Sequence, residues 1–273
     1  MIPSDIANQV NDILQGITTP IYIDSVGDNG ICGSGFFFLR KISNDESKIY
    51  LITAKHVLYP RDRFSVNKSL YFIIREENQG NFSIKHKELK KEILEDRIKK
   101  HPNEDVISID VSKELGYLIS QSIPQKLFNA LGTSTFPPEN FQFMTGSDIL
   151  VTGYPKGFFD TTNLFPIVTK TSISSRWGYN FKGDKIFLID RIFRSITEAS
   201  SGSLIITNPF YYKIRNDIDN DDDKTKIINY NTPQFYFLGI YLGIPQEKVS
   251  NNAYRNIPDV GICLYSHCIN AII

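Results

Sequence analysis

Residues 50–57 of the chain decide its fold and read Tyr-Leu-Ile-Thr-Ala-Lys-His-Val. The first four side chains are typical of a buried strand, and the stretch then leaves that strand with a histidine, His56. A dozen residues earlier, residues 33–38 read Gly-Ser-Gly-Phe-Phe-Phe, which predicts a second strand that opens on two glycines. A residue at the end of a strand is held by a rigid sheet, so His56 is a candidate functional residue.

Short β-like runs continue on both sides of this stretch. They are rich in Ile, Val, Phe and Tyr, and their bounds carry Gly, Pro, Asn, Asp and Ser. Their number and spacing predict a mostly-β sandwich or barrel rather than alternating βαβ units. The predicted strands are Pro20–Ile23, Gly35–Leu39, Ile49–Thr53, Leu70–Ile74, Val106–Val111, Ile149–Gly153, Ile167–Ile173, Ile186–Ile189, Leu204–Thr207 and Phe235–Leu242.

Helices are predicted at the two ends of the chain, and the mixed-charge residues 85–100 are expected to form an exposed hairpin or helix surface. Ser4 is a suitable N-cap and Asp5 suits the positive end of a helix. The apolar side chains that follow recur with helical spacing, at Ile6, Val10, Ile13 and Leu14. Residues 264–273 could close the chain as a second short helix. Between them, residues 127–140 collect Gly, Ser, Thr and Pro and divide the chain into two similar halves.

Composition excludes several classes of function. The 273 residues carry 30 basic and 30 acidic side chains, so the net charge is zero and a strongly basic nucleic-acid-binding protein is not expected. No apolar run approaches the roughly 20 residues of a membrane-spanning helix. The longest, Phe235–Pro245, has the length of a strand. We therefore expect neither a nucleic-acid nor a membrane partner.

Cysteine usage and the N-terminus point to a reducing compartment. The three cysteines, Cys32, Cys263 and Cys268, form no C-x-x-C pair and are too few for a disulfide framework. The first residues have no basic region followed by a long apolar core, so a secretory signal is not predicted. The expected location is the cytoplasm. No metal or organic cofactor is implied by any motif.

Two further patterns carry possible chemistry and follow His56 in the chain. Residues 101–106 read His-Pro-Asn-Glu-Asp-Val, which places Asp105 before a predicted strand. Residues 198–205 read Glu-Ala-Ser-Ser-Gly-Ser-Leu-Ile, with Ser201 directly before a glycine. Each pattern alone is common. Together they supply a hydroxyl nucleophile, a base to remove its proton, and a carboxylate to orient that base, in one of the known chain orders of such triads.

These motifs resemble those of the trypsin-like (chymotrypsin-fold) serine peptidases, and in particular the disulfide-free bacterial branch that includes the HtrA-type proteases. That family carries a G-[ST]-G-F strand start and a T-x-x-H-V segment, matched at residues 33–36 and 53–57. Its acid opens a strand, as Asp105 does, and its nucleophile precedes a glycine, as Ser201 does. Weaker matches are its G-Y-P turn at residues 153–155, its P-[VIL]-V strand at residues 166–173 and its G-I strand at residues 239–240.

The resemblance implies an all-β fold of two Greek-key, six-stranded β-barrels with short helices at both ends. In this chain the N-terminal helix would span residues 1–19, and the N-terminal barrel residues 20–127. The C-terminal barrel would span residues 128–262, and the C-terminal helix residues 263–273. No internal repeat is visible.

The resemblance also assigns roles residue by residue. Ser201 would be the nucleophile, with Ser200 as the alternative, His56 the general base and Asp105 the residue that orients it. The backbone N–H groups of Ala199 and Ser201 would form the oxyanion hole. The substrate pocket would be bounded by Ser195, Ile240, Tyr241, Leu242, Gly243 and Ile244. No carboxylate stands in this set, so a small or medium aliphatic residue is expected at the cleaved bond rather than Lys or Arg.

One departure from the family pattern bears on activity. Ala199 stands where the family has a glycine, whose usual backbone conformation costs an L-residue about 1–2 kcal/mol. An incomplete oxyanion hole at rest, completed by substrate or by an activating partner, is one hypothesis. The remaining histidines are assigned elsewhere, His86 and His101 to the surface and His267 to the closing helix.

Three functions follow from these observations. The first is an intracellular serine endopeptidase that hydrolyses a protein or peptide substrate through an acyl-enzyme. The second is a latent or inactive member of the same fold that serves as a binding or sensing module. The third is an unrelated β-rich structural or ligand-binding protein, in which the ordered His, Asp and Ser motifs are coincidental.

Overall fold

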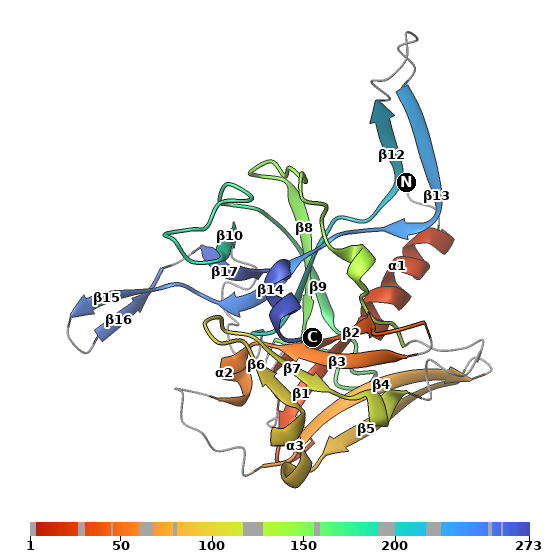
Figure 1. Ribbon diagram of the computed structural model, residues 1–273, viewed down its shortest axis with the longest axis vertical. Coiled ribbons are helices and arrows are strands. Elements are labelled where there is room, and N and C mark those ends of the chain that lie inside the picture. Colours follow the sequence, from red (N-terminus) through yellow and green to blue (C-terminus); the bar gives the residue numbers. More distant parts are fainter. Residues whose placement is uncertain are drawn as a thin grey trace.

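The computed structural model describes residues 4–26, 31–44, 46–59, 68–78, 81–116, 128–155, 159–190, 200–216, 225–250, 253–257 and 259–273. Within these ranges strands dominate, and two antiparallel sheets lie one above the other (Figure 1). Helices are few and short apart from the first. They are α1 (Ser4–Ile17), α2 (Lys55–Leu58), α3 (Lys91–Arg97), α4 (Ser112–Leu115) and two 3-10 helices at Thr133–Thr135 and Ser266–Ala271.

The first sheet has seven strands in the order β5-β4-β1-β2-β3-β7-β6, all antiparallel to their neighbours. It occupies the red-to-yellow half of the molecule in Figure 1. Its strands are β1 (Thr18–Ile23), β2 (Ile31–Lys41), β3 (Ser47–Thr53), β4 (Leu70–Asn78), β5 (Asn81–Leu89), β6 (Ile98–Lys100) and β7 (Ile107–Asp110).

The second sheet has six strands in the order β10-β17-β14-β11-β8-β9. A bridge between Ile173 and Ile189 joins the far end of β9 to β10, so this sheet closes on itself as a barrel. Its strands are β8 (Asp148–Gly153), β9 (Ile167–Ser172), β10 (Ile186–Asp190), β11 (Leu204–Thr207), β14 (Phe237–Gly243) and β17 (Val260–Tyr265). Two hairpins project from the body, β12 (Phe210–Asn216) with β13 (Thr225–Gln234), and β15 (Gln246–Ser250) with β16 (Ala253–Asn256) (Figure 1).

The three consecutive phenylalanines of β2 show how the two cores form. Phe37 belongs to the core of the first sheet, whereas Phe36 and Phe38 belong to the core that extends into the second sheet. Successive side chains of a strand point to opposite faces, so a strand buried on both faces must be apolar throughout. Phe36 meets Phe237 of β14 with ring centroids 5.2 Å apart. The two barrels therefore share a hydrophobic interface through β2.

Polar groups also join the two halves. The buried guanidinium of Arg75, on β4, donates to the carbonyl oxygens of Gln15 and Thr18 on its own side. It also donates to the Tyr154 hydroxyl and the Leu164 carbonyl oxygen, which follow β8. Hydrogen bonds from a charged donor are stronger than those between neutral groups. Arg75 thus ties the end of α1 to the second half of the chain.

The structure confirms the expected all-β, two-barrel architecture of chymotrypsin-like proteins, and all ten predicted strands are present. Some details differ. The first sheet has seven strands instead of six, and residues 260–265, part of which were assigned to a closing helix, form β17. The chain then ends in a 3-10 helix. Across the described segments, no helix is long and apolar enough to cross a membrane.

Candidate active site

Two neighbouring strands bring His56 and Asp105 to one edge of the first sheet. Strands β3 and β7 pair antiparallel with Thr53 opposite Ile107, so the last residue of β3 lies beside the first residue of β7. His56 comes three residues after Thr53, in α2, and Asp105 comes two residues before Ile107. Because the register of the pair is fixed by buried side chains on both strands, the two functional groups must meet.

Asp105 binds His56 with both of its carboxylate oxygens. Oδ2 lies 2.5 Å from the Nδ1 atom of the His56 ring, and Oδ1 accepts the His56 backbone N–H at 2.9 Å. The backbone carbonyl of Asp105 also accepts the N–H of Lys55, at 3.3 Å. The carboxylate therefore fixes both the start of α2 and the orientation of the imidazole. His56 and Asp105 are partly accessible, with side chains 41% and 32% exposed.

The charge state of Asp105 determines which nitrogen of His56 holds the proton. Burial acts to raise the pKa of Asp105, but the hydrogen bonds from His56 and the charges of His56 and Lys55 outweigh it and hold the pKa below its ordinary value. The carboxylate is therefore ionised at neutral pH and can only accept hydrogen bonds. Nδ1 must carry the proton that it donates to Oδ2, which leaves the lone pair on Nε2, where a general base needs it.

Ser201 lies on a tight turn that precedes β11 and contacts both halves of the molecule. Its carbonyl oxygen accepts the N–H of Ser34 on β2 at 2.9 Å, and the N–H of Gly202 donates to the Tyr241 carbonyl on β14 at 2.8 Å. The Ser201 hydroxyl donates to the carbonyl oxygen of Leu242 at 3.0 Å. A hydroxyl has one proton, so in this geometry that proton goes to Leu242 and not to His56.

Two glycines allow the serine turn to approach the first sheet closely. Gly202 has a φ of +86°, and a Cβ atom there would collide with the Ser34 carbonyl oxygen. On Gly33, a Cβ atom would lie 2.6 Å from Cγ1 of Val57, next to His56, and 3.1 Å from the carbonyl oxygen of Ser201. Gly33 thus lies between α2, which carries His56, and the turn that carries Ser201. This contact places the two motifs side by side.

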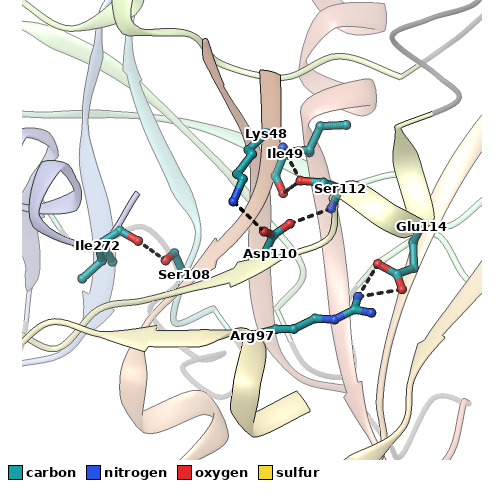
Figure 2. Close-up of polar contacts among 8 residues, drawn as sticks. All are labelled: Lys48, Ile49, Arg97, Ser108, Asp110, Ser112, Glu114 and Ile272. Carbon is teal, nitrogen blue, oxygen red and sulfur yellow. Dashed lines mark hydrogen bonds and ion pairs between the residues drawn. The ribbon is translucent and has the colours of Figure 1, made fainter. Parts of the chain in front are cut away.

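The far ends of β3 and β7 are anchored by a separate polar network (Figure 2). Asp110 accepts the N–H of Ser112 at 3.0 Å and pairs with Lys48 at 3.7 Å, and the Ser112 hydroxyl accepts the N–H of Ile49 at 3.0 Å. Nearby, Arg97 binds both carboxylate oxygens of Glu114 at 2.7 Å (Figure 2). Because hydrogen bonds hold both of its ends, the β3–β7 pair is a rigid support for His56 and Asp105, which together form the dyad of the site.

The expected pocket residues differ in burial and in their distance from Ser201. Ile240 and Tyr241 are buried in the core of the second barrel, whereas Leu242 and Ile244 are half-buried. Gly243 lies beside the serine, since a Cβ atom on it would be 4.0 Å from Ser201 Oγ. Two other expected site residues, Ser195 and Ala199, lie outside the described residues. Ser200, the alternative nucleophile, is 1% exposed, so its hydroxyl is not accessible to a substrate.

The assignment of His101 to the surface is wrong. The residue is only 6% exposed, and its ring accepts hydrogen bonds from the turn that contains Asp105. The sequence signal was its separation of four residues from Asp105, but a histidine's burial depends on the fold. His86 is exposed on β5, as predicted, and His267 is exposed on the final 3-10 helix. Over the described ranges, no group of three or more His, Cys, Asp or Glu side chains is placed to hold a metal ion.

Comparisons with known proteins found matches among solved structures. No protein-family model matches the sequence, and no curated protein matches it. Among solved structures, a mutant of human heparin-binding protein aligns with a TM-score of 0.49 and 8% identity, over 95% of this chain and 90% of that chain. The atomic-resolution structure of HBP aligns with a TM-score of 0.48 and 6% identity, over 94% of this chain and 89% of that one.

Proposed function

We propose that the chain is a serine endopeptidase in which Ser201 is the nucleophile, His56 the general base and Asp105 the residue that orients the base. The observation that carries the proposal is the double contact of Asp105 with the ring and the backbone of His56. A carboxylate held in this way fixes the tautomer that a hydroxyl nucleophile requires. The docking of the serine turn on Gly33, next to α2, supports Ser201 as the partner of this dyad.

The reaction follows from these groups. Nε2 of His56 takes the proton of the Ser201 hydroxyl while Oγ attacks the carbonyl carbon of the substrate peptide bond. The imidazolium, stabilised by Asp105, then gives that proton to the leaving amine as the carbon–nitrogen bond breaks. A water molecule repeats the sequence on the acyl-enzyme, which releases the carboxylic acid and restores Ser201. No metal or organic cofactor takes part in these steps.

Negative charge develops on the substrate carbonyl oxygen during each attack. The backbone N–H of Ser201 is a suitable donor to it, because no acceptor for this N–H is found in the part of the chain that the structure describes. The N–H of Ala199 is the second donor that we propose. Loss of one such donor costs about 3 kcal/mol of transition-state stabilisation, so the conformation of Ala199 bears directly on the rate.

One observation favours the second candidate, a latent form of the same enzyme. The Ser201 hydroxyl donates to Leu242 and not to His56, so its side chain must rotate before proton transfer. A substrate or an activating partner that displaces this hydrogen bond would switch the site on. In this second candidate function, the chain acts as a binding or sensing module until that partner is present.

The substrate we propose is a protein or peptide with a small or medium aliphatic residue at the cleaved bond. Leu242 and Gly243 border the serine, Ile244 follows them in the chain, and none of the three carries a charge to pair with Lys or Arg. We propose the cytoplasm as the location, since Cys263 and Cys268 are free thiols and both are buried. The one feature of the HtrA-type branch that we propose for this chain is the absence of disulfides.

The test is cleavage of a diverse peptide library, with products identified by mass spectrometry. We expect cleavage after aliphatic residues that is abolished in Ser201→Ala and retained in Ser200→Ala. The second variant is a matched control, because the buried Ser200 hydroxyl has no hydrogen-bond partner among the residues that the structure describes. Equal cleavage by Ser201→Ala would overturn the proposed nucleophile, and a profile dominated by Arg or Lys would overturn the proposed specificity.

A further inference from the structure

His101 is built into the turn that carries Asp105. It directly follows β6 and is 6% exposed. Its Nδ1 atom accepts the backbone N–H groups of Asn103, at 3.2 Å, and Glu104, at 2.9 Å. The ends of the same turn are closed by hydrogen bonds from the His101 N–H to the Val106 carbonyl and from the Val106 N–H to the Glu104 carbonyl. Asp105 is therefore held between residues that His101 positions.

These contacts require a neutral ring. A nitrogen that accepts a hydrogen bond must keep its lone pair, so Nδ1 is unprotonated and the ring proton is on Nε2. In the imidazolium both nitrogens are donors. An N–H at Nδ1 would face the N–H groups of Asn103 and Glu104, and both hydrogen bonds would be lost. Protonation of His101 is thus incompatible with the observed turn.

The groups that face His101 come from three parts of the chain. They are the Glu104 carboxylate of its own turn, the Lys55 ammonium of α2 and the Lys185 ammonium just before β10. Lys185 also pairs with Glu104 at 4.0 Å. Burial is the largest reason that the pKa of His101 lies below its ordinary value, and the two lysines reinforce the effect while Glu104 opposes it.

We propose that His101 is a positioning residue for Asp105, and that protonation of its ring releases the turn and uncouples Asp105 from His56. The inference rests on the proposed function for its effect on catalysis. Asp105 contacts His56 at 2.5 Å and 2.9 Å, distances that a small displacement of the turn would break. The site then has two acid-sensitive steps. One is protonation of the base itself, and the other is protonation of the residue that holds its carboxylate in place.

The chain offers a matched pair of substitutions. In asparagine the Oδ1 atom occupies the place that Nδ1 has in histidine, and it accepts hydrogen bonds from the second and third following N–H groups without titrating. His101→Asn therefore keeps a hydrogen-bond acceptor for the turn and removes the ring that can be protonated. Leucine fills similar space and removes the acceptor altogether. His101→Asn and His101→Leu thus separate the hydrogen bonds from the volume of the side chain.

The first measurement is the rate of fluorophosphonate labelling of Ser201 between pH 4.5 and 8. At pH 8 we expect His101→Leu to label about 10–100-fold more slowly than the wild type, the cost of a displaced catalytic group, and His101→Asn to recover most of that loss. As the pH falls, the logarithm of the wild-type labelling rate should decrease with a slope that changes from one to two per pH unit. The slope for His101→Asn should stay at one. If the labelling rates of the two proteins decreased with the same slope at acid pH, the inference would be overturned.

The second measurement does not depend on catalysis. In the NMR spectra of the wild type, the amides of Asn103 and Glu104 should shift with the same midpoint as the His101 ring nitrogens, and in His101→Asn they should stay in place. If these shifts appear but no labelling occurs at any pH, the proposed function fails while the switch in the turn stands. If the amides do not move as the ring titrates, the switch itself is refuted. Should His101→Leu fail to fold, His101→Asn carries both measurements.

Discussion

Asp105 directs both carboxylate oxygens at a single residue, and this is the feature of the site with the clearest consequences at the scale of one residue. Oδ2 binds the His56 ring and Oδ1 binds the His56 backbone N–H. The sequence could predict that these two residues meet, because their motifs resemble a known pair. It could not predict the second contact, or that His101 supports the turn from inside, because both depend on the path of the backbone between residues 101 and 106.

We expect Asp105→Asn to lower the labelling rate of Ser201 about 10³–10⁴-fold, because the amide would favour the wrong tautomer of His56. Stability should respond to pH as well. Folding lowers the pKa of Asp105, so its stabilising effect is complete above the unfolded value of about 3.9 and is lost as the pH falls through the lower folded value. Urea midpoints of the two proteins should therefore differ at pH 6 and converge towards pH 3. A constant difference would contradict this account.

Gly202 gives the second prediction at this scale. Its φ of +86° and the close Ser34 carbonyl should make Gly202→Ala both strained and sterically blocked. Gly146 is the matched control, with a φ of +89° and open space where a Cβ would lie. Gly146→Ala should cost about 1–2 kcal/mol from strain alone, and Gly202→Ala distinctly more, with loss of labelling. The free energy of unfolding from urea titration measures both, and equal values would argue against the collision.

At the scale of elements, the β3–β7 pair determines where the dyad forms. Its strands are tied at one end by Asp105 and at the other by the Asp110–Ser112–Ile49 network (Figure 2). Both strands were predictable, because the apolar run of β3 is buried on two faces and Ile107 and Ile109 of β7 alternate with polar residues. Strand β5 was predicted only as part of an exposed hairpin or helix surface, because residues 85–89 mix basic and acidic side chains, and the projecting hairpins were not predicted.

Ser112→Ala tests this anchor. The change leaves the N–H of Ile49, a fully buried residue, without its side-chain acceptor, and an unsatisfied buried donor costs about 1–3 kcal/mol. We expect a loss of unfolding free energy in that range. Ser83→Ala is the comparison, because the hydroxyl of Ser83 makes an exposed hydrogen bond to Glu76, and the variant should stay within about 0.5 kcal/mol of the wild type. A neutral Ser112→Ala would mean that the network does not hold the strands.

At the scale of the whole molecule, the site exists only where the two barrels meet. The dyad belongs to the first sheet and Ser201 to the turn before β11 of the second, and they are joined through β2. Arg75 binds both halves, and Ser108 on β7 donates to the Ile272 carbonyl near the end of the chain (Figure 2). The sequence indicated two halves and a shared site. It carried no signal for Arg75, because a single arginine becomes a link between barrels only when both have folded.

Arg75→Met should weaken this link. The substitution keeps much of the apolar stem but leaves the carbonyls of Gln15, Thr18 and Leu164 without a charged donor. With hydrogen bonds to charged groups each contributing about 1.5–3 kcal/mol, we expect a loss of about 3 kcal/mol or more in urea unfolding. Arg75→Lys should recover little, since one ammonium cannot replace the planar five-donor guanidinium. Full stability of the lysine variant would contradict the geometric argument.

The central claim is that Ser201 is a nucleophile activated by His56, and site-resolved fluorophosphonate labelling tests it most directly. After labelling and digestion, mass spectrometry locates the adduct on the chain. The account predicts an adduct on Ser201 that is undiminished in Ser200→Ala and nearly absent in His56→Ala. An adduct on Ser200, or labelling of Ser201 that does not need His56, would contradict it. If the wild type is not labelled even with candidate substrates and partners present, the protein has the fold without the activity proposed for it.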